Sequence, residues 1–145
     1  MTINPTSRNN LAWMLDGLVE IPHVVYAIVL STDGLIIQKS TRLPMDTAEV
    51  IAAGACSLYS LVRGVGQHFE SGPVQQAIIE YGDRTLLVAE AGKNARLAVV
   101  CEQSVDMGTV GYEMSRLVTR IGEFLGTEAR SAALAMNQTG KTHDG

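Results

Sequence analysis

Few residues in this chain have the types and spacing that catalysis or metal binding requires. His23, His68 and His143 are far apart, and none has a second His or Cys at a metal-ligand spacing. Cys56 lies in an uncharged stretch and Cys101 ends an apolar run, which is typical of buried cysteines that act as small hydrophobes. We therefore expect no metal site and no bound cofactor.

Two glycine-containing segments raise the question of nucleotide binding. The segment 92–94 (GKN) lacks the earlier glycine of GxxxxGK[ST], and it lies between two strand-like runs, whereas a phosphate-binding loop opens a helix. We interpret it as a turn. The segment 64–66 (GVG) is an isolated GxG at a helix end without a preceding strand, which favours helix packing or termination over dinucleotide binding.

The candidate nucleophiles and acids lack partners in the sequence. Ser57 and Ser60 lie in a helical stretch without the strand-turn-helix of a nucleophile elbow, so we interpret them as small packing residues. Glu80, Glu90 and Glu102 fall at or near strand ends, where solvated edges explain them. We predict no catalytic residue and a protein that is not an enzyme.

Two arginines raise the question of an arginine finger. An exposed Arg42 or Arg63 could approach the phosphate of a partner GTPase. Position in the sequence alone does not assign that role to either residue.

Composition limits the classes of partner. The 145 residues fit one domain, and the eleven Lys and Arg residues are scattered through a chain of net charge −4, which indicates neither nucleic acid nor anionic lipid as a partner. The strongly apolar run 24–30 is far shorter than the roughly 20 residues of a membrane span. We expect a cytoplasmic protein without direct membrane insertion.

The most informative segment is Val50–Val62, thirteen residues without a charge. An ordinary surface helix keeps one face solvated, so this pattern predicts a helix that is covered on two sides. One stripe of larger apolar residues is expected to face a sheet, and it comprises Ile51, Ala55, Leu58, Val62 and Val65. A second stripe of small residues is expected to pair with another helix as a dimer interface, and it comprises Ala53, Ser57, Ser60 and Gly64.

Alternating periodicities predict the other elements. An amphipathic helix over 11–19 should end before Pro22, and strands at 24–31 and 35–40 should form a hairpin around Asp33-Gly34. The spacing of Asp46 and Glu49 resembles a capping box for the long helix, which should run to about Gly66 or Phe69. Three further strands, at 74–81, 85–91 and 95–101, follow with short antiparallel connections.

A third helix should begin near Asp106. Gly108, Gly111 and Gly122 lie roughly opposite its apolar face, which suggests either close approach of another backbone or simply an imperfect helix. After Gly126 the helix should continue only briefly, residues 127–145 should be a largely flexible extension, and the last nine residues should be disordered.

These elements predict a single α+β domain with three layers. Five strands form one antiparallel sheet, the long central helix covers one face, and the other two helices cover the opposite face. Either a dimeric interaction platform or a ligand-sensing domain of the PAS or GAF type fits such an architecture. A sensor would need a ligand-sized cavity, whereas a platform needs a filled core and a self-complementary patch.

The order and spacing of these segments resemble the roadblock/LC7 family, over about residues 8–126. The resemblance rests on Gly17–Ser40, the small-residue helix after Asp46, LLVAEAG from Leu86, LAVV from Leu97 and the closing helix, and it is closest to the bacterial, MglB-like branch of actinobacteria. The resemblance implies a profilin-like fold and a dimer whose central helices pair and whose third strands can join. It also implies a Ras-like small GTPase as partner, and in actinobacteria an accompanying sensor kinase-like protein.

Overall fold

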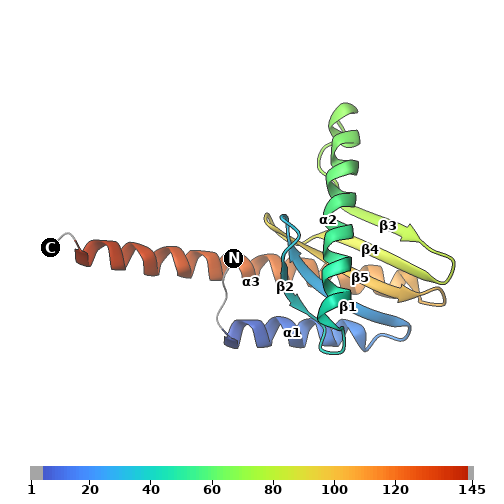
Figure 1. Cartoon of the computed structure of the whole chain (residues 1–145), viewed down its shortest axis with the longest axis horizontal. Helices are drawn as coiled ribbons and strands as arrows, with labels where there is room; N and C mark the ends of the chain where they lie inside the picture. The colour runs from blue at the N-terminus through green and yellow to red at the C-terminus, as the bar shows by residue number, and fades with distance from the viewer. Residues whose placement is uncertain (1–4, 144–145) are drawn as a thin grey trace.

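The computed structural model describes residues 5–143, with side chains described for residues 10–137. Figure 1 shows three helices and five strands over this range, in the order α1 (Pro5–Val19), β1 (Val24–Ser31), β2 (Ile36–Lys39), α2 (Met45–His68), β3 (Gln76–Glu80), β4 (Arg84–Glu90), β5 (Ala95–Glu102) and α3 (Met107–His143). The sequence predicted this order of elements correctly.

The strands form one antiparallel sheet in the order β2-β1-β5-β4-β3. The central pair is β1 and β5, where Val29 lies opposite Leu97. At one edge of the sheet, β3 pairs with β4 through Ile78 and Leu87. The short loops predicted between the last three strands therefore do connect antiparallel neighbours.

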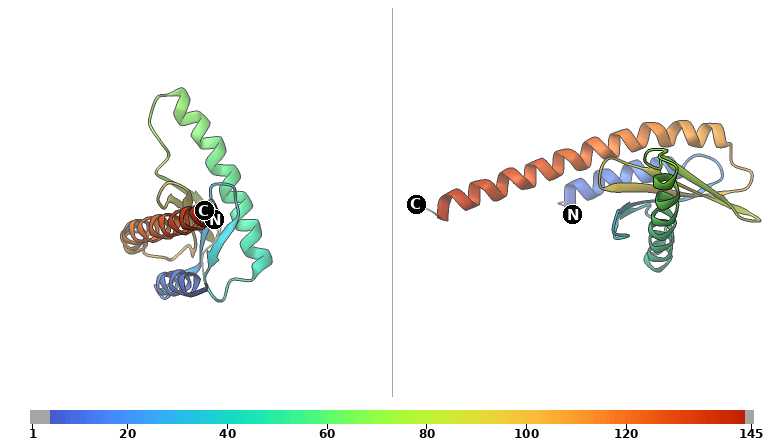
Figure 2. Two further views of the ribbon diagram at one scale, coloured as in Figure 1. Left: turned by 90° about the vertical axis from the view of Figure 1, so that its left-hand side faces the viewer. Right: turned by 90° about the horizontal axis from the view of Figure 1, so that it is seen from above.

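Strand alternation divides the core into two layers. On β1, Ile28 and Leu30 pack against the α2 side of the sheet, whereas Ala27 and Val29 pack against the side of α1 and α3. Figure 2 shows α2 on one side of the sheet and both other helices on the opposite side. The predicted three-layer α+β architecture is confirmed.

The start of α2 differs from the prediction, whereas the start of α3 follows it. The residue before α2 is Pro44, and Asp46 accepts a hydrogen bond from the backbone N–H of Thr47, so the predicted capping box does not form. At α3, the Asp106 carboxylate accepts hydrogen bonds from the N–H groups of Gly108 and Thr109, at 3.1 and 3.3 Å. This pattern is that of a side-chain N-cap.

Of Gly108, Gly111 and Gly122 on α3, Gly122 does mark a close backbone approach. A Cβ built on Gly122 would lie 3.1 Å from both Cα and N of Gly92, in the β4–β5 turn. Gly92 itself has φ of +83°, a conformation that side chains rarely adopt. By contrast, a Cβ on Gly111 would have no neighbour within 4 Å among the described residues.

The third helix is longer than the sequence suggested. It continues past Gly126 to His143, and residues 129–137 are exposed, so this part projects away from the domain in Figure 1. Good helix formers occupy 127–136 (TEARSAALAM), and the structure shows open space around Gly126, so a single glycine does not end the helix. The domain boundary at 126 and the flexibility of 127–145 stay predictions, and residues 144–145 lie outside the described chain.

Candidate functional site

The side of α2 that covers the sheet is built from small residues. Ala48, Ala52, Ala55 and Tyr59 are its buried positions, at helical spacing. Alanines let the helix backbone lie close to the strands, and Tyr59 fills the space further along, where its hydroxyl donates to the Val74 carbonyl at 3.3 Å. Burial raises the pKa of Tyr59 to about 12, with a further upward contribution from nearby Glu90.

This arrangement corrects the predicted sheet-facing stripe. Of its members, Ala55 is buried, Ile51, Leu58 and Val62 are half-buried, and Val65 is 58% exposed. The predicted stripe is rotated from the true one because both sides of this helix are apolar, so periodicity does not say which side meets the sheet.

The four predicted interface residues all lie on the exposed side of α2. Ala53, Ser57, Ser60 and Gly64 are exposed, and the sheet covers none of them. Three large apolar side chains lie beside them, and these are Val50 (73% exposed), Leu61 (73%) and Val65 (58%). The sequence pattern assigned Val65 to the sheet-facing stripe and the other two to neither stripe. We call this set of seven residues the outer face of α2.

A signal for the missed residues was present in the sequence. Val50, Ser57 and Leu61 follow spacings of seven and four residues, which places them on one side of a helix. Isolated apolar side chains on a surface are ordinary, but a row of them along one side of a helix is typical of a candidate interaction surface.

The end of α2 and one edge of the sheet are also uncovered. The C-terminal half of α2 extends beyond β3 in Figure 1, and Phe69 at its end is 70% exposed. The edge strand β3 carries Ile78, which is 53% exposed and lies opposite Leu87, so it points to the α1 and α3 side of the sheet. An exposed edge strand presents unpaired backbone groups that a second strand can use.

By length and composition, α2 could also cross a membrane, a test that helices of soluble proteins can pass as well. In this fold it lies on the sheet through Ala48, Ala52 and Ala55. Polar and charged residues also interrupt its exposed surface, among them Ser57 and Arg63. Such polar and charged residues are costly within a lipid bilayer.

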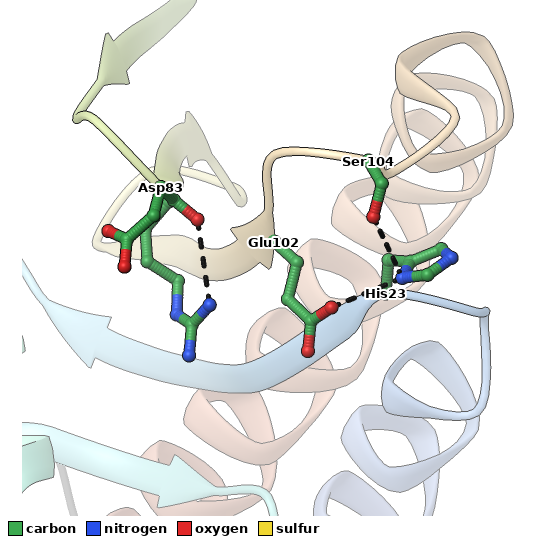
Figure 3. Close-up of polar contacts among 5 residues, drawn as sticks. His23, Asp83, Glu102 and Ser104 are labelled. Carbon is green, nitrogen blue, oxygen red and sulfur yellow. Dashed lines mark hydrogen bonds and ion pairs between the residues drawn. The ribbon is translucent and has the colours of Figure 1, made fainter.

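Figure 3 shows a polar cluster that resembles a catalytic triad in composition alone. His23 directly precedes β1, Glu102 is at the end of β5 and Ser104 lies in the following turn. Ser104 Oγ and Glu102 Oε2 both contact the same ring atom, His23 Nδ1, at 3.0 and 3.2 Å. In a triad the acid and the nucleophile contact different ring nitrogens, so this geometry does not activate the serine.

The cluster has a structural role instead. His23 has φ of +72° and its carbonyl accepts a hydrogen bond from the Glu102 N–H at 2.8 Å, so the contacts join the start of β1 to the end of β5. In the same view, the Asp83 carbonyl accepts a 3.5 Å hydrogen bond from Arg84. Among the described residues, no group of three His, Cys, Asp or Glu side chains is placed to hold a metal ion.

Both cysteines are free thiols, and the predicted burial is confirmed for Cys101 but not for Cys56. Cys101 is fully buried, and burial raises the pKa of its thiol to about 11. Cys56 is half-buried on α2, where its thiol donates to the Thr32 carbonyl at 3.4 Å. That contact fixes the β1–β2 turn against α2.

Comparison with known proteins identifies the family. Residues 11–101 match the Roadblock/LC7 domain, a segment that contains the outer face of α2 and the β3 edge. The chain belongs to the roadblock/LC7 family. A roadblock/LC7 domain from Streptomyces avermitilis is 38% identical, with a TM-score of 0.75 over 79% of this chain and 96% of that chain.

More distant roadblock/LC7-like structures share the fold. A structure described as MglB with tetrameric arrangement has 15% identity and a TM-score of 0.77 over 86% of this chain and 93% of that chain. The gliding protein MglB from Thermus thermophilus has 16% identity and a TM-score of 0.75 over 85% and 96% of the two chains. A comparison with curated proteins gave no match.

Proposed function

We propose that this roadblock/LC7 protein is a noncatalytic homodimer that serves as a scaffold or co-regulator of a Ras-like small GTPase in a bacterial signalling system. The observation that carries the proposal is the outer face of α2, an apolar surface on a helix that the rest of the domain leaves uncovered. In this proposal Ala53, Ser57, Ser60 and Gly64 form the centre of the dimer interface.

A second copy of the chain suits this surface. The small side chains at Ala53, Ser57 and Gly64 permit two helix backbones to approach, and Leu61 and Val65 supply apolar area around them. A two-fold axis would place the same patch of each copy against the other. The tetrameric arrangement of the MglB relative supports self-association in this fold.

The GTPase assignment rests on family membership. The paired helices would occupy the outer face of α2, so a GTPase would bind the composite surface that pairing creates. The proposal includes a cytoplasmic location and a sensor kinase-like protein as a further partner. Family membership also favours the platform over the PAS or GAF sensor that the sequence left open.

The test measures binding to a Ras-like small GTPase from the same organism. Calorimetry is performed with the GTPase loaded with GDP and with a nonhydrolysable GTP analogue, and hydrolysis is measured with and without this protein. A regulator must bind the two nucleotide states with different affinities, because equal affinity shifts no equilibrium. Ser57→Lys should weaken GTPase binding and any change in hydrolysis, because it disrupts pairing of the two α2 helices. Thr119→Lys, at an exposed site on α3, should not.

Two results would count against this proposal. Absence of binding in both nucleotide states would reject the GTPase as partner. Equal binding with unchanged hydrolysis would leave a scaffold and remove the regulatory role.

A further inference from the structure

A buried arginine lies on the α2 side of the sheet, beneath Tyr59 of α2. Arg96 is 5% exposed on β5, and its Nε and Nη1 atoms have no hydrogen-bond partner among the described residues. Its guanidinium stacks on the Tyr59 ring, with Cζ 4.2 Å from the ring centroid. A buried cation without hydrogen-bond partners is costly, so such a group in a native protein requires an explanation.

The neighbouring carboxylate of Glu90 does not fully explain the burial of this cation. Glu90 lies directly across from Arg96 on β4, yet its Oε1 is 3.9 Å from Arg96 Nε, beyond hydrogen-bond distance. Stacking on Tyr59 holds the guanidinium in place, and its Nε and Nη1 groups stay without a hydrogen-bond partner among the described residues.

Arg96 lines a cavity that carries an excess of positive charge. The cavity is about 240 Å³ in volume, and its other lining residues include Glu90, Arg63 from α2, Lys93 from the β4–β5 turn and Thr32 from the β1–β2 turn. Three cations thus surround one carboxylate. Neither Arg63 nor Lys93 forms an ion pair with a described carboxylate.

The walls of the cavity are held in position by the fold. The Thr32 N–H donates to the Asn94 carbonyl at 3.3 Å, which joins the two turns. The Thr32 carbonyl accepts from Cys56, and Tyr59 bonds to Val74 on the connection to β3. A site whose charged groups are already positioned binds a ligand with less ordering cost.

We propose that this cavity binds a small oxyanion, a phosphate or carboxylate group, between Arg96, Arg63 and Lys93. The volume is below the roughly 300–1,000 Å³ of sites for drug-sized ligands, and it suits a single anionic group. The fork of Arg96 is the geometry that recognises such oxyanions, with Lys93 and Arg63 adding charge at the mouth. The segment 92–94 is thus a turn, as predicted, that contributes a lysine to an anion site.

The experiment uses the full chain and two probes, sodium phosphate and sodium acetate, at constant ionic strength maintained with sodium chloride. The Nε–H resonance of Arg96 in NMR spectra reports on the site directly, and calorimetry measures affinity. We expect a saturable shift of that resonance with at least one of the two probes. The stronger probe distinguishes a phosphate from a carboxylate ligand.

Matched variants separate a built site from general salt effects. Lys93→Gln should weaken binding several-fold, and Glu90→Gln should strengthen it because it removes the competing carboxylate. Arg42→Gln, which changes an exposed arginine outside the cavity, should leave the affinity unchanged. Arg96→Met should abolish binding, with its folding checked by circular dichroism.

Three outcomes would overturn the proposal. The first is a shift of the Arg96 Nε–H resonance that does not saturate with either phosphate or acetate. The second is an equal shift when sodium chloride is added in place of both probes. The third is unchanged affinity in both Lys93→Gln and Glu90→Gln, two exposed or half-buried positions where substitution leaves the core intact.

Discussion

Replacement of Gly122 by alanine should destabilise the domain through one identified contact. The added Cβ would lie 3.1 Å from Gly92 Cα and N, which is tighter than ordinary van der Waals contact, and the neighbour is backbone that cannot rotate away. Overpacking of this kind costs about 1–3 kcal/mol of unfolding free energy. Alanine also gains about 0.8–1 kcal/mol of helix propensity over glycine, so the net loss for Gly122→Ala is up to about 2 kcal/mol.

Gly111→Ala provides the matched control on the same helix. A Cβ there meets no described atom within 4 Å, so this variant should keep the propensity gain and become more stable by about 0.5–1 kcal/mol. The difference between the two variants cancels the propensity term. We expect it to be about 1–3 kcal/mol, which is the steric cost alone.

The assay is urea unfolding followed by far-ultraviolet circular dichroism, at two protein concentrations because self-association would change the apparent stability. Gly92→Ala should lose more than Gly122→Ala, since it adds a strained φ of +83° to the same contact. Equal unfolding free energies for Gly122→Ala and Gly111→Ala would refute the claim that the β4–β5 turn packs directly on α3.

Three further outcomes are expected. Burial raises the pKa of Cys101 from 9.0 to about 11, so the stability that its neutral thiol contributes below pH 9 is lost as pH rises from 9 to 11. Unfolding midpoints should therefore fall over that window, and they should fall less in Cys101→Ala. Parallel pH profiles of the wild type and this variant would contradict the expectation. The isolated protein should neither bind nor hydrolyse GTP or ATP, and micromolar binding in calorimetry with protein free of GTPase would be inconsistent with that expectation. A chain shortened to residues 1–126 should unfold cooperatively with nearly unchanged midpoint, because residues 129–137 are exposed; loss of the transition would show that the extension is part of the domain.

Local sequence signals predicted most of the fold. The alternation of β1, the Asp33-Gly34 turn and the Asp106 helix start all depend on neighbours within a few residues, and Gly34 does adopt a positive φ of 83°. The rotation of α2 was not predictable in this way. Both sides of that helix are apolar, and only the assembled sheet shows that Ala48 and Ala52 face inward.

The candidate sites depended on long-range contacts. In the sequence, Arg96 has the pattern of an ordinary strand residue. Its burial follows from the placement of Tyr59 above it and Glu90 beside it in the folded domain. The contact of Gly122 with Gly92 likewise joins segments that are distant in the sequence. The outer face of α2 was partly predictable, because Ser57 and Gly64 were assigned to it from helical spacing alone.

The most direct test of the central claim is the mass of the protein in solution, measured by light scattering on the full chain. We expect the wild type to have the mass of two chains, and Ser57→Lys and Leu61→Lys to be folded monomers, because each would bury an unpaired ammonium where two helices meet. Thr119→Lys should stay dimeric. A monomeric wild type, or an unchanged dimer in both α2 variants, would contradict the claim that the outer face of α2 is the self-association surface.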